Sequence, residues 1–221
     1  MYKTETHLHT AEVSRCSRLR AAEMVKCYHE ADYKTVIITD HLTSRYMNSL
    51  GDIPWQDKIT IFFHGYYKAK EAARQFDMNV LMGAEITFPG IDNHYLIYGI
   101  TKEFLVSCPG LFQNGLEAFY EKAKKHNILV VQAHPYRDEK CFPTLQYVDG
   151  IEVYNSNPRH NEYNDKAEEL VRGNNLYCIA GSDAHRPEDL ALSGVLTENE
   201  IKNMKEFIKI IKSGQFELIR E

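Results

Sequence analysis

The chain has 221 residues, 43% of them hydrophobic and 26% charged, which is enough to bury a core and fits a single domain over residues 1–221. Its formal net charge of −5 argues against an extended nucleic-acid-binding surface. The five cysteines are odd in number and include no C-x-x-C pair, which argues against a disulfide framework. No run is apolar enough to cross a membrane, so we expect a cytoplasmic protein without a membrane partner.

Short apolar runs rich in β-branched and aromatic residues predict seven strands, and helical patterns lie between many of them. The predicted strands are 2–6, 34–39, 79–85, 94–100, 127–133, 150–154 and 176–182. The predicted helices are 19–31, 62–76, 115–126, 161–173 and 199–214. Residues 44–58 are expected to form the longest loop, which could either select substrate or pack over the mouth of the fold.

Sequential strand and helix units of this kind fit either a doubly wound sheet or a closed barrel, and periodicity alone does not separate the two. The polar residues favour a barrel, because a barrel gathers the carboxyl ends of its parallel strands onto one face. The polar residues at predicted strand ends are His7, His9, Asp40, His41, Glu85, His134, Asp183 and His185.

The spacing within these groups indicates a shared metal site. Residues i and i+2 of a strand point to the same side, so His7 with His9, and Asp183 with His185, can each present two side chains to one cavity. One H-x-H pair alone is more often an ordinary strand end. A mixed set of imidazoles and carboxylates this large suits more than one zinc, iron or manganese ion.

His94 begins a predicted strand instead of ending one, so a strictly parallel barrel would put it on the wrong face. Residues 89–93 contain proline, glycine, aspartate and asparagine, which favour a tight turn. If the chain turns back there, the next strand runs antiparallel and starts beside Glu85. We therefore expect His94 to be a further metal ligand.

Other residues near the presumed ligands have less certain roles. Arg137 and Arg186 lie close to ligands in sequence, and a guanidinium matches phosphate oxygens in two-point contacts, so either could bind the substrate. Asp40 could orient the His41 ring or cap a helix. Segment 15–20 adds positive charge, and the role of Cys16 within it stays open.

In this order, the motifs "HLHT", "TDH", "GAEITF", "HYLIYG", "QAHPYR", "GIEVYN" and "GSDAH" resemble the PHP (polymerase and histidinol phosphatase) family of metal-dependent phosphoesterases. The resemblance spans most of the chain. It implies an α/β fold, a distorted (β/α)7 TIM-like barrel of the PHP type, with two or three divalent metal ions as cofactors.

The resemblance also implies a division of ligands. The first ion would take His7, His9, Glu85 and Asp183, and Glu85 would bridge to a second ion held by His94 and His134. A third would take His41 and His185 with one ligand from the loop after "HLHT". Many family members have Asp or His several residues beyond the H-x-H pair, where this chain has Ser14, and Glu12 is the nearest candidate.

The expected activity is hydrolysis of a small phosphorylated metabolite or nucleotide by a metal-activated hydroxide. We expect His185, His41 and Asp183 to be catalytic, with a histidine protonating the leaving group. The alternatives are a short-oligonucleotide exonuclease or phosphodiesterase, an amide or lactone hydrolase, and a regulatory metal-binding domain with little turnover. The sequence does not identify the substrate, the metal or the oligomeric state.

Overall fold

The computed structural model describes residues 1–221 and contains a strand in each of the seven predicted segments. Apolar β-branched runs form these strands because both faces of a barrel strand are covered. They are β1 (Tyr2–Leu8), β2 (Tyr33–Ile38), β4 (Asn79–Thr87), β5 (His94–Tyr98), β6 (Leu129–Ala133), β7 (Gly150–Asn155) and β8 (Tyr177–Gly181). Three further strands were not predicted: β3 (His41–Leu42), β9 (Ser193–Thr197) and β10 (Glu217–Arg220).

Helices also occur in all five predicted segments. They are α1 (Ala21–Glu30), α4 (His64–Ala73), α6 (Gly115–Lys124), α7 (Asn164–Arg172) and α8 (Met204–Ser213). The prediction of a long loop over 44–58 was wrong, because α2 (Ser44–Ser49) and the start of α3 (Trp55–Phe62) lie there. The side chain of Thr43 caps α2 by accepting from the backbone N–H of Tyr46. The remaining helical segments are α5 (Lys102–Val106) and the short 3₁₀ turns η1 (Arg137–Glu139) and η2 (Pro187–Asp189).

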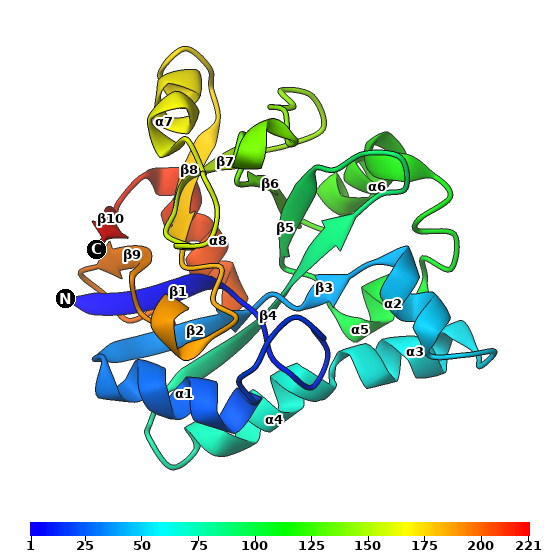
Figure 1. Ribbon diagram of the computed structural model, residues 1–221, viewed down its shortest axis with the longest axis horizontal. Coiled ribbons are helices and arrows are strands. Elements are labelled where there is room, and N and C mark those ends of the chain that lie inside the picture. Colours follow the sequence, from blue (N-terminus) through cyan, green and yellow to red (C-terminus); the bar gives the residue numbers. More distant parts are fainter.

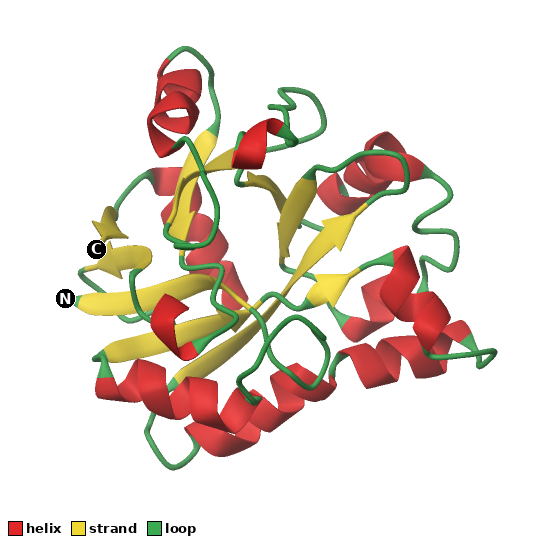
Figure 2. Ribbon diagram, in the orientation of Figure 1, coloured by secondary structure: helices red, strands yellow, loops and turns green.

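The strands form one strongly curved sheet that nearly closes into a barrel, with the helices around its outside (Figures 1 and 2). The strand order is β10-β9-β1-β2-β4-β5-β6-β7-β8, and β3 pairs with β4. Closure between the first and last barrel strands comes from a bridge of Leu8 to Ala184 and a hydrogen bond from His9 N to Ala184 O. The expected α/β, TIM-like barrel is therefore confirmed.

The turn after β4 reverses the chain as predicted. Strand β5 pairs antiparallel with β4, with Thr87 opposite His94, and antiparallel with β6, with His94 opposite Ala133. This reversal brings the first residue of β5 to the face where β4 and β6 end. His94 thus reaches the same mouth of the barrel as Glu85 and His134.

The C-terminal elements complete the barrel wall next to the N-terminus (Figure 1). Strand β9 pairs antiparallel with β1, and β10 pairs antiparallel with β9. Helix α8 buries Phe207, Ile208 and Ile211 in an apolar cluster that also holds residues of β2, β4, β5, β6 and β8. None of the helices is long and apolar enough to cross a membrane.

Candidate metal centre

All the predicted ligands except Glu12 converge on one mouth of the barrel. Ligand atoms that lie within 4.8 Å of one another define three overlapping groups. These are His9 with His41 and His185, His7 with His9 and Glu85, and His41 with Glu85 and His94. Apart from His41 and His94, the clustered side chains are buried, although imidazoles and carboxylates are otherwise common at surfaces.

Glu85, which is 1% exposed, is the centre of this arrangement. Its two oxygens face five histidines that come from three strands and from the segments after β1 and β6, as expected for a bridging carboxylate. The distances are 2.6 Å to His41 Nδ1, 2.9 Å to His94 Nδ1, 3.1 Å to His134 Nε2, 3.5 Å to His7 Nε2 and 3.7 Å to His9 Nε2.

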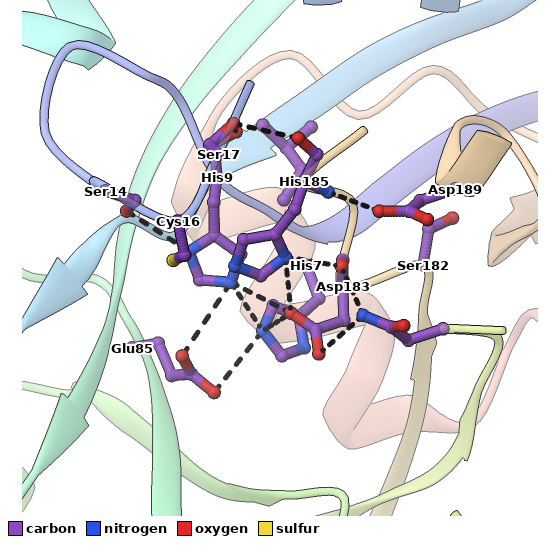
Figure 3. Close-up of polar contacts among 12 residues, drawn as sticks. His7, His9, Ser14, Cys16, Ser17, Glu85, Ser182, Asp183, His185 and Asp189 are labelled. Atoms are coloured by element: carbon purple, nitrogen blue, oxygen red, sulfur yellow. Dashed lines mark hydrogen bonds and ion pairs between the residues drawn. The ribbon is translucent and has the colours of Figure 1, made fainter. Parts of the chain in front are cut away.

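Asp183 is the second carboxylate of the centre that contacts several of its residues (Figure 3). Its Oδ1 lies 3.0 Å from His9 Nε2 and 3.3 Å from His7 Nε2, while Oδ2 accepts from Arg137 Nη2 at 2.5 Å. Asp183 and His134 both have positive φ, 49° and 28°. Such conformations are uncommon for residues other than glycine, and strain of this kind clusters at functional sites.

A carboxylate that the sequence analysis missed orients the first histidine. Nδ1 of His7 donates to Glu152 Oε1 at 2.8 Å, and this leaves Nε2 facing Asp183 and Glu85. Glu152 is fully buried in β7 and also accepts from His134 N and Asn155 Nδ2. Fixing the tautomer of a ligating histidine in this way is typical of metal sites.

The ionisable side chains of the centre differ in the direction of their pKa shifts. Burial opposes charge on Glu85, yet His94 and His41 hold the pKa of its carboxyl well below the usual range. Burial also disfavours a charged His41, but Glu85 raises its pKa to about 10. For His134, burial and Arg137 lower the pKa to about 3. Protonated histidines therefore neutralise the carboxylates in this structure, and a bound metal cation would take over that role.

Three buried polar atoms at the centre have no hydrogen-bond partner. These are Nδ1 of His134 and the pair formed by Oε2 of Glu85 and Nδ1 of His41, which lie 2.6 Å apart without hydrogen-bonding geometry. Buried polar atoms are normally paired, so an unpaired donor-acceptor set of this kind fits coordination of a cation. The donors are imidazole nitrogens and carboxylate oxygens, which suit zinc, iron or manganese.

The structure does not bring Glu12 into the clustered groups. Its Oε2 accepts from the backbone N–H of Ala21 at 2.9 Å, so the side chain caps the start of α1. The loop contributes Cys16 instead, whose Sγ lies 3.2 Å from Nε2 of His41. Burial would raise the pKa of this thiol, but hydrogen bonds with His185 and His41 lower it to about 6.

The Asp40 side chain neither hydrogen-bonds to the His41 ring nor caps a helix, the two roles considered for it. It accepts from Thr10 N, Thr10 Oγ1 and Ser14 Oγ, each at 2.7 Å. Ser14 Oγ in turn accepts from His41 N at 3.0 Å and lies 3.4 Å from His9 Nδ1. Asp40 therefore holds the loop after β1, and its effect on the ligands passes through Ser14.

The two arginines considered for substrate binding have different surroundings. Arg137 is an internal counter-ion, because its guanidinium pairs with Asp183 and with Glu162 at 2.7 Å. Arg186 begins η2, and its side chain lies 3.8 Å from Glu188 Oε1. Neither lines the cavity described next, and their contact with substrate stays a prediction.

A cavity of about 520 Å³ opens directly beside the cluster. His41 and His94 form its inner wall, and Arg15, Arg45 and Tyr46 are among its other lining residues. No carboxylate lines it. The cavity is therefore positively charged in a chain whose net charge is −5. Arg45 and Tyr46 belong to α2, in the segment for which substrate selection and packing over the barrel mouth were both considered.

The structure thus defines an α/β barrel with a candidate polynuclear metal centre at the mouth. Residues 161–216 match the family model described as PHP-associated. No curated protein matches the sequence. The partial family match and the fold of the solved structures below confirm the resemblance to the PHP family.

Three solved structures share the fold at low sequence identity. The chain is similar to a two-domain protein from Bacteroides vulgatus that contains a predicted PHP-like metal-dependent phosphoesterase (16% identity, TM-score 0.69), with all of this chain and 65% of that one covered. It is also similar to PsfC from Pseudomonas syringae, at 16% identity and a TM-score of 0.69, with 100% of this chain and 91% of PsfC covered. The lesion-specific endonuclease PfuEndoQ from Pyrococcus furiosus matches at 15% identity and a TM-score of 0.64. The match covers 98% of this chain and 57% of PfuEndoQ.

Proposed function

We propose that this protein is a metal-dependent phosphoesterase that hydrolyses a small phosphorylated metabolite or nucleotide. The observation that carries the proposal is Glu85, a buried carboxylate that faces five histidines and has an oxygen without a hydrogen-bond partner. A fold-level likeness supports this activity but does not establish it, since one fold hosts many functions.

The residues divide into groups that would hold adjacent cations. His7, His9, Asp183 and Glu85 would hold one ion, and Glu85 with His94 and His134 would hold a second. When bound, adjacent divalent ions neutralise phosphoryl oxygens and lower the pKa of a bound water. The protein's own contribution is to fix these donors, with Glu152 orienting His7 and Arg137 holding Asp183.

Of the residues predicted to be catalytic, His41 and His185 lie nearest to the cavity. His41 lines it, and His185 Nε2 lies 3.4 Å from His41 Nε2. Burial opposes a charge on His185, but Cys16 and Asp183 raise its pKa, so the ring can carry a proton for a departing alkoxide when it does not hold a metal ion. Asp183, the third residue, contributes by holding His7 and His9.

The cavity favours an anionic substrate. Arg15 and Arg45 supply two guanidinium groups beside the inner histidines, and guanidinium binds phosphate oxygens in two-point contacts. This argues against an uncharged amide or lactone, which an apolar wall would suit better. A polynucleotide substrate is disfavoured by the net charge of −5, although PfuEndoQ has a similar fold and a nucleotide would fit the cavity chemistry.

The experiment combines metal analysis with phosphate release from panels of phosphomonoesters and phosphodiesters, with and without added manganese. Glu85→Gln should lose bound metal and lower turnover by about 100-fold or more, because even the partners of ligands contribute 10- to 100-fold. Glu71→Gln, on the exposed face of α4, is the matched control.

Arg45→Ala tests the cavity separately. We expect KM for the preferred ester to rise about tenfold, as for a lost charge-assisted contact of 1.5 kcal/mol, with kcat changed less. Bound metal without turnover on any ester would favour the regulatory domain, and turnover confined to oligonucleotides would favour the exonuclease. Turnover of amides or lactones alone would overturn the phosphoesterase proposal.

A further inference from the structure

Cys16 lies where a third protein ligand would complete a group of two histidines. Its Sγ is 3.2 Å from His41 Nε2, and Cys16 and His41 both line the cavity. The two histidine Nε2 atoms are themselves only 3.4 Å apart. A sulfur and two imidazole nitrogens from three separate chain segments therefore face one small volume at the inner end of the cavity.

A second observation shows that this volume is suited to a cation. Nitrogen atoms of His41 and His185 lie within 4.8 Å of one another and of His9. Glu85 Oε2 lies 2.6 Å from Nδ1 of His41, and this contact orients the ring so that Nε2 faces Cys16 and His185.

The loop that carries Cys16 is attached to both histidine segments. On one side, Ser14 Oγ accepts from His41 N at 3.0 Å. On the other side, Arg18 N donates to His185 O at 2.8 Å, and Ser17 Oγ donates to His9 O at 2.8 Å (Figure 3). Because the flanking residues fix the loop at both ends, the thiol is held toward the rings, as a preorganised ligand must be.

We propose that Cys16 binds a divalent cation as a thiolate, together with His41 and His185, and supplies the loop ligand for which Glu12 was the candidate. On binding, the S–H proton is released to solvent and a sulfur–metal bond forms. One sulfur and two nitrogens form a softer donor set than the mixed imidazole and carboxylate donors of the remaining centre, so this position should select zinc or cobalt over manganese. The inference rests on the proposed metal centre.

Cobalt(II) provides a test that is independent of turnover. Metal-stripped protein titrated with cobalt(II) should develop a thiolate-to-cobalt charge-transfer band in the near ultraviolet, which imidazole and carboxylate ligands do not give. Cys16→Ser should abolish this band and weaken binding of the last equivalent of metal by about 10- to 100-fold. Cys27→Ser, which removes another partly accessible thiol on α1, is the matched control and should keep the band.

Alkylation offers a second measurement that needs no variant. Cys16 is exposed, so iodoacetamide should modify it in metal-stripped protein, and added zinc should slow that modification about tenfold or more while Cys27 is unaffected. Cobalt binding with no charge-transfer band, or a band retained in Cys16→Ser, would overturn the assignment while leaving the phosphoesterase intact. A thiolate band in a protein without esterase activity would support the ligand and refute the proposed function.

Discussion

At the scale of single residues, Asp40 shows how hydrogen bonds to a loop distinguish a structural carboxylate from the equally buried ligands beside it. The carboxyl is 1% exposed and accepts three hydrogen bonds from Thr10 and Ser14. Burial raises its pKa to about 6, although those hydrogen bonds favour the ionised form. The folded chain therefore binds the Asp40 proton more tightly than the unfolded chain does.

This shift predicts a pH dependence of stability. Between the unfolded pKa of about 3.9 and the folded value near 6, the native state holds the extra proton, so the Asp40 contribution is lost as pH rises through this range. Relative to Asp40→Asn, the wild type should lose on the order of 2 kcal/mol between about pH 4.5 and about pH 7.5. Urea unfolding of metal-stripped proteins at both pH values measures the difference, and a pH-independent difference would contradict the prediction.

At the scale of elements, β8 passes so close to β1 that only glycine fits at one position. A Cβ on Gly181 would overlap the Cβ of His7 and lie 2.9 Å from Glu152 Oε1. Gly181→Ala should therefore destabilise the fold by about 1 to 3 kcal/mol and weaken metal binding, because the His7–Glu152 pair must shift.

The matched control for this prediction is Gly173→Ala. Gly173 follows α7, and a Cβ there would meet nothing within 4 Å. Its effect on the free energy of unfolding should stay within about 0.5 kcal/mol. Equal effects of the two substitutions on unfolding and on metal titration would show that the close approach of β8 to β1 does not position the centre.

Helix α8 allows the same kind of comparison in the core. Phe207 is fully buried against the barrel strands, whereas Phe142 is 66% exposed. Phe207→Ala should lower the free energy of unfolding by about 3 to 5 kcal/mol, and Phe142→Ala by no more than about 0.5 kcal/mol. Urea denaturation midpoints test both, and similar midpoints would mean that α8 is not part of the cooperative core.

The barrel strands and most ligands could be predicted from sequence because each signal is local. An apolar run predicts a strand, and a histidine at the end of that run can be read directly from the sequence. Glu152 was missed because it lies inside a mostly apolar strand instead of at its end. Only the folded barrel shows that its side chain faces His7. The sequence did not show whether Cys16 or Glu12 reaches the cluster. Tertiary hydrogen bonds, such as that from Ser14 to Asp40, set the conformation of the loop that carries both residues. Helix α2 is a short helix of six residues, too short for a periodic pattern.

At the scale of the whole molecule, the centre joins strands that are far apart in sequence. Its ligands come from the ends of β1, β4 and β6, from β3, from the start of β5 and from the segment after β8. The centre therefore spans the junction where β1 meets the segment after β8 through the Leu8–Ala184 bridge and the hydrogen bond from His9 N to Ala184 O. Cations that bind the folded chain alone should tie these strands together and stabilise the entire fold.

Removal and return of metal test this coupling. At a free metal concentration about 100-fold above Kd, binding adds about 2.7 kcal/mol, which corresponds to a Tm increase of roughly 5 to 10 °C for a chain of this size. Glu85→Gln should lose most of this increase, because Glu85 faces five of the histidines, whereas Glu71→Gln should retain it. A Tm that does not change on adding zinc, cobalt or manganese to the stripped wild type would mean that the clustered histidines hold no ion.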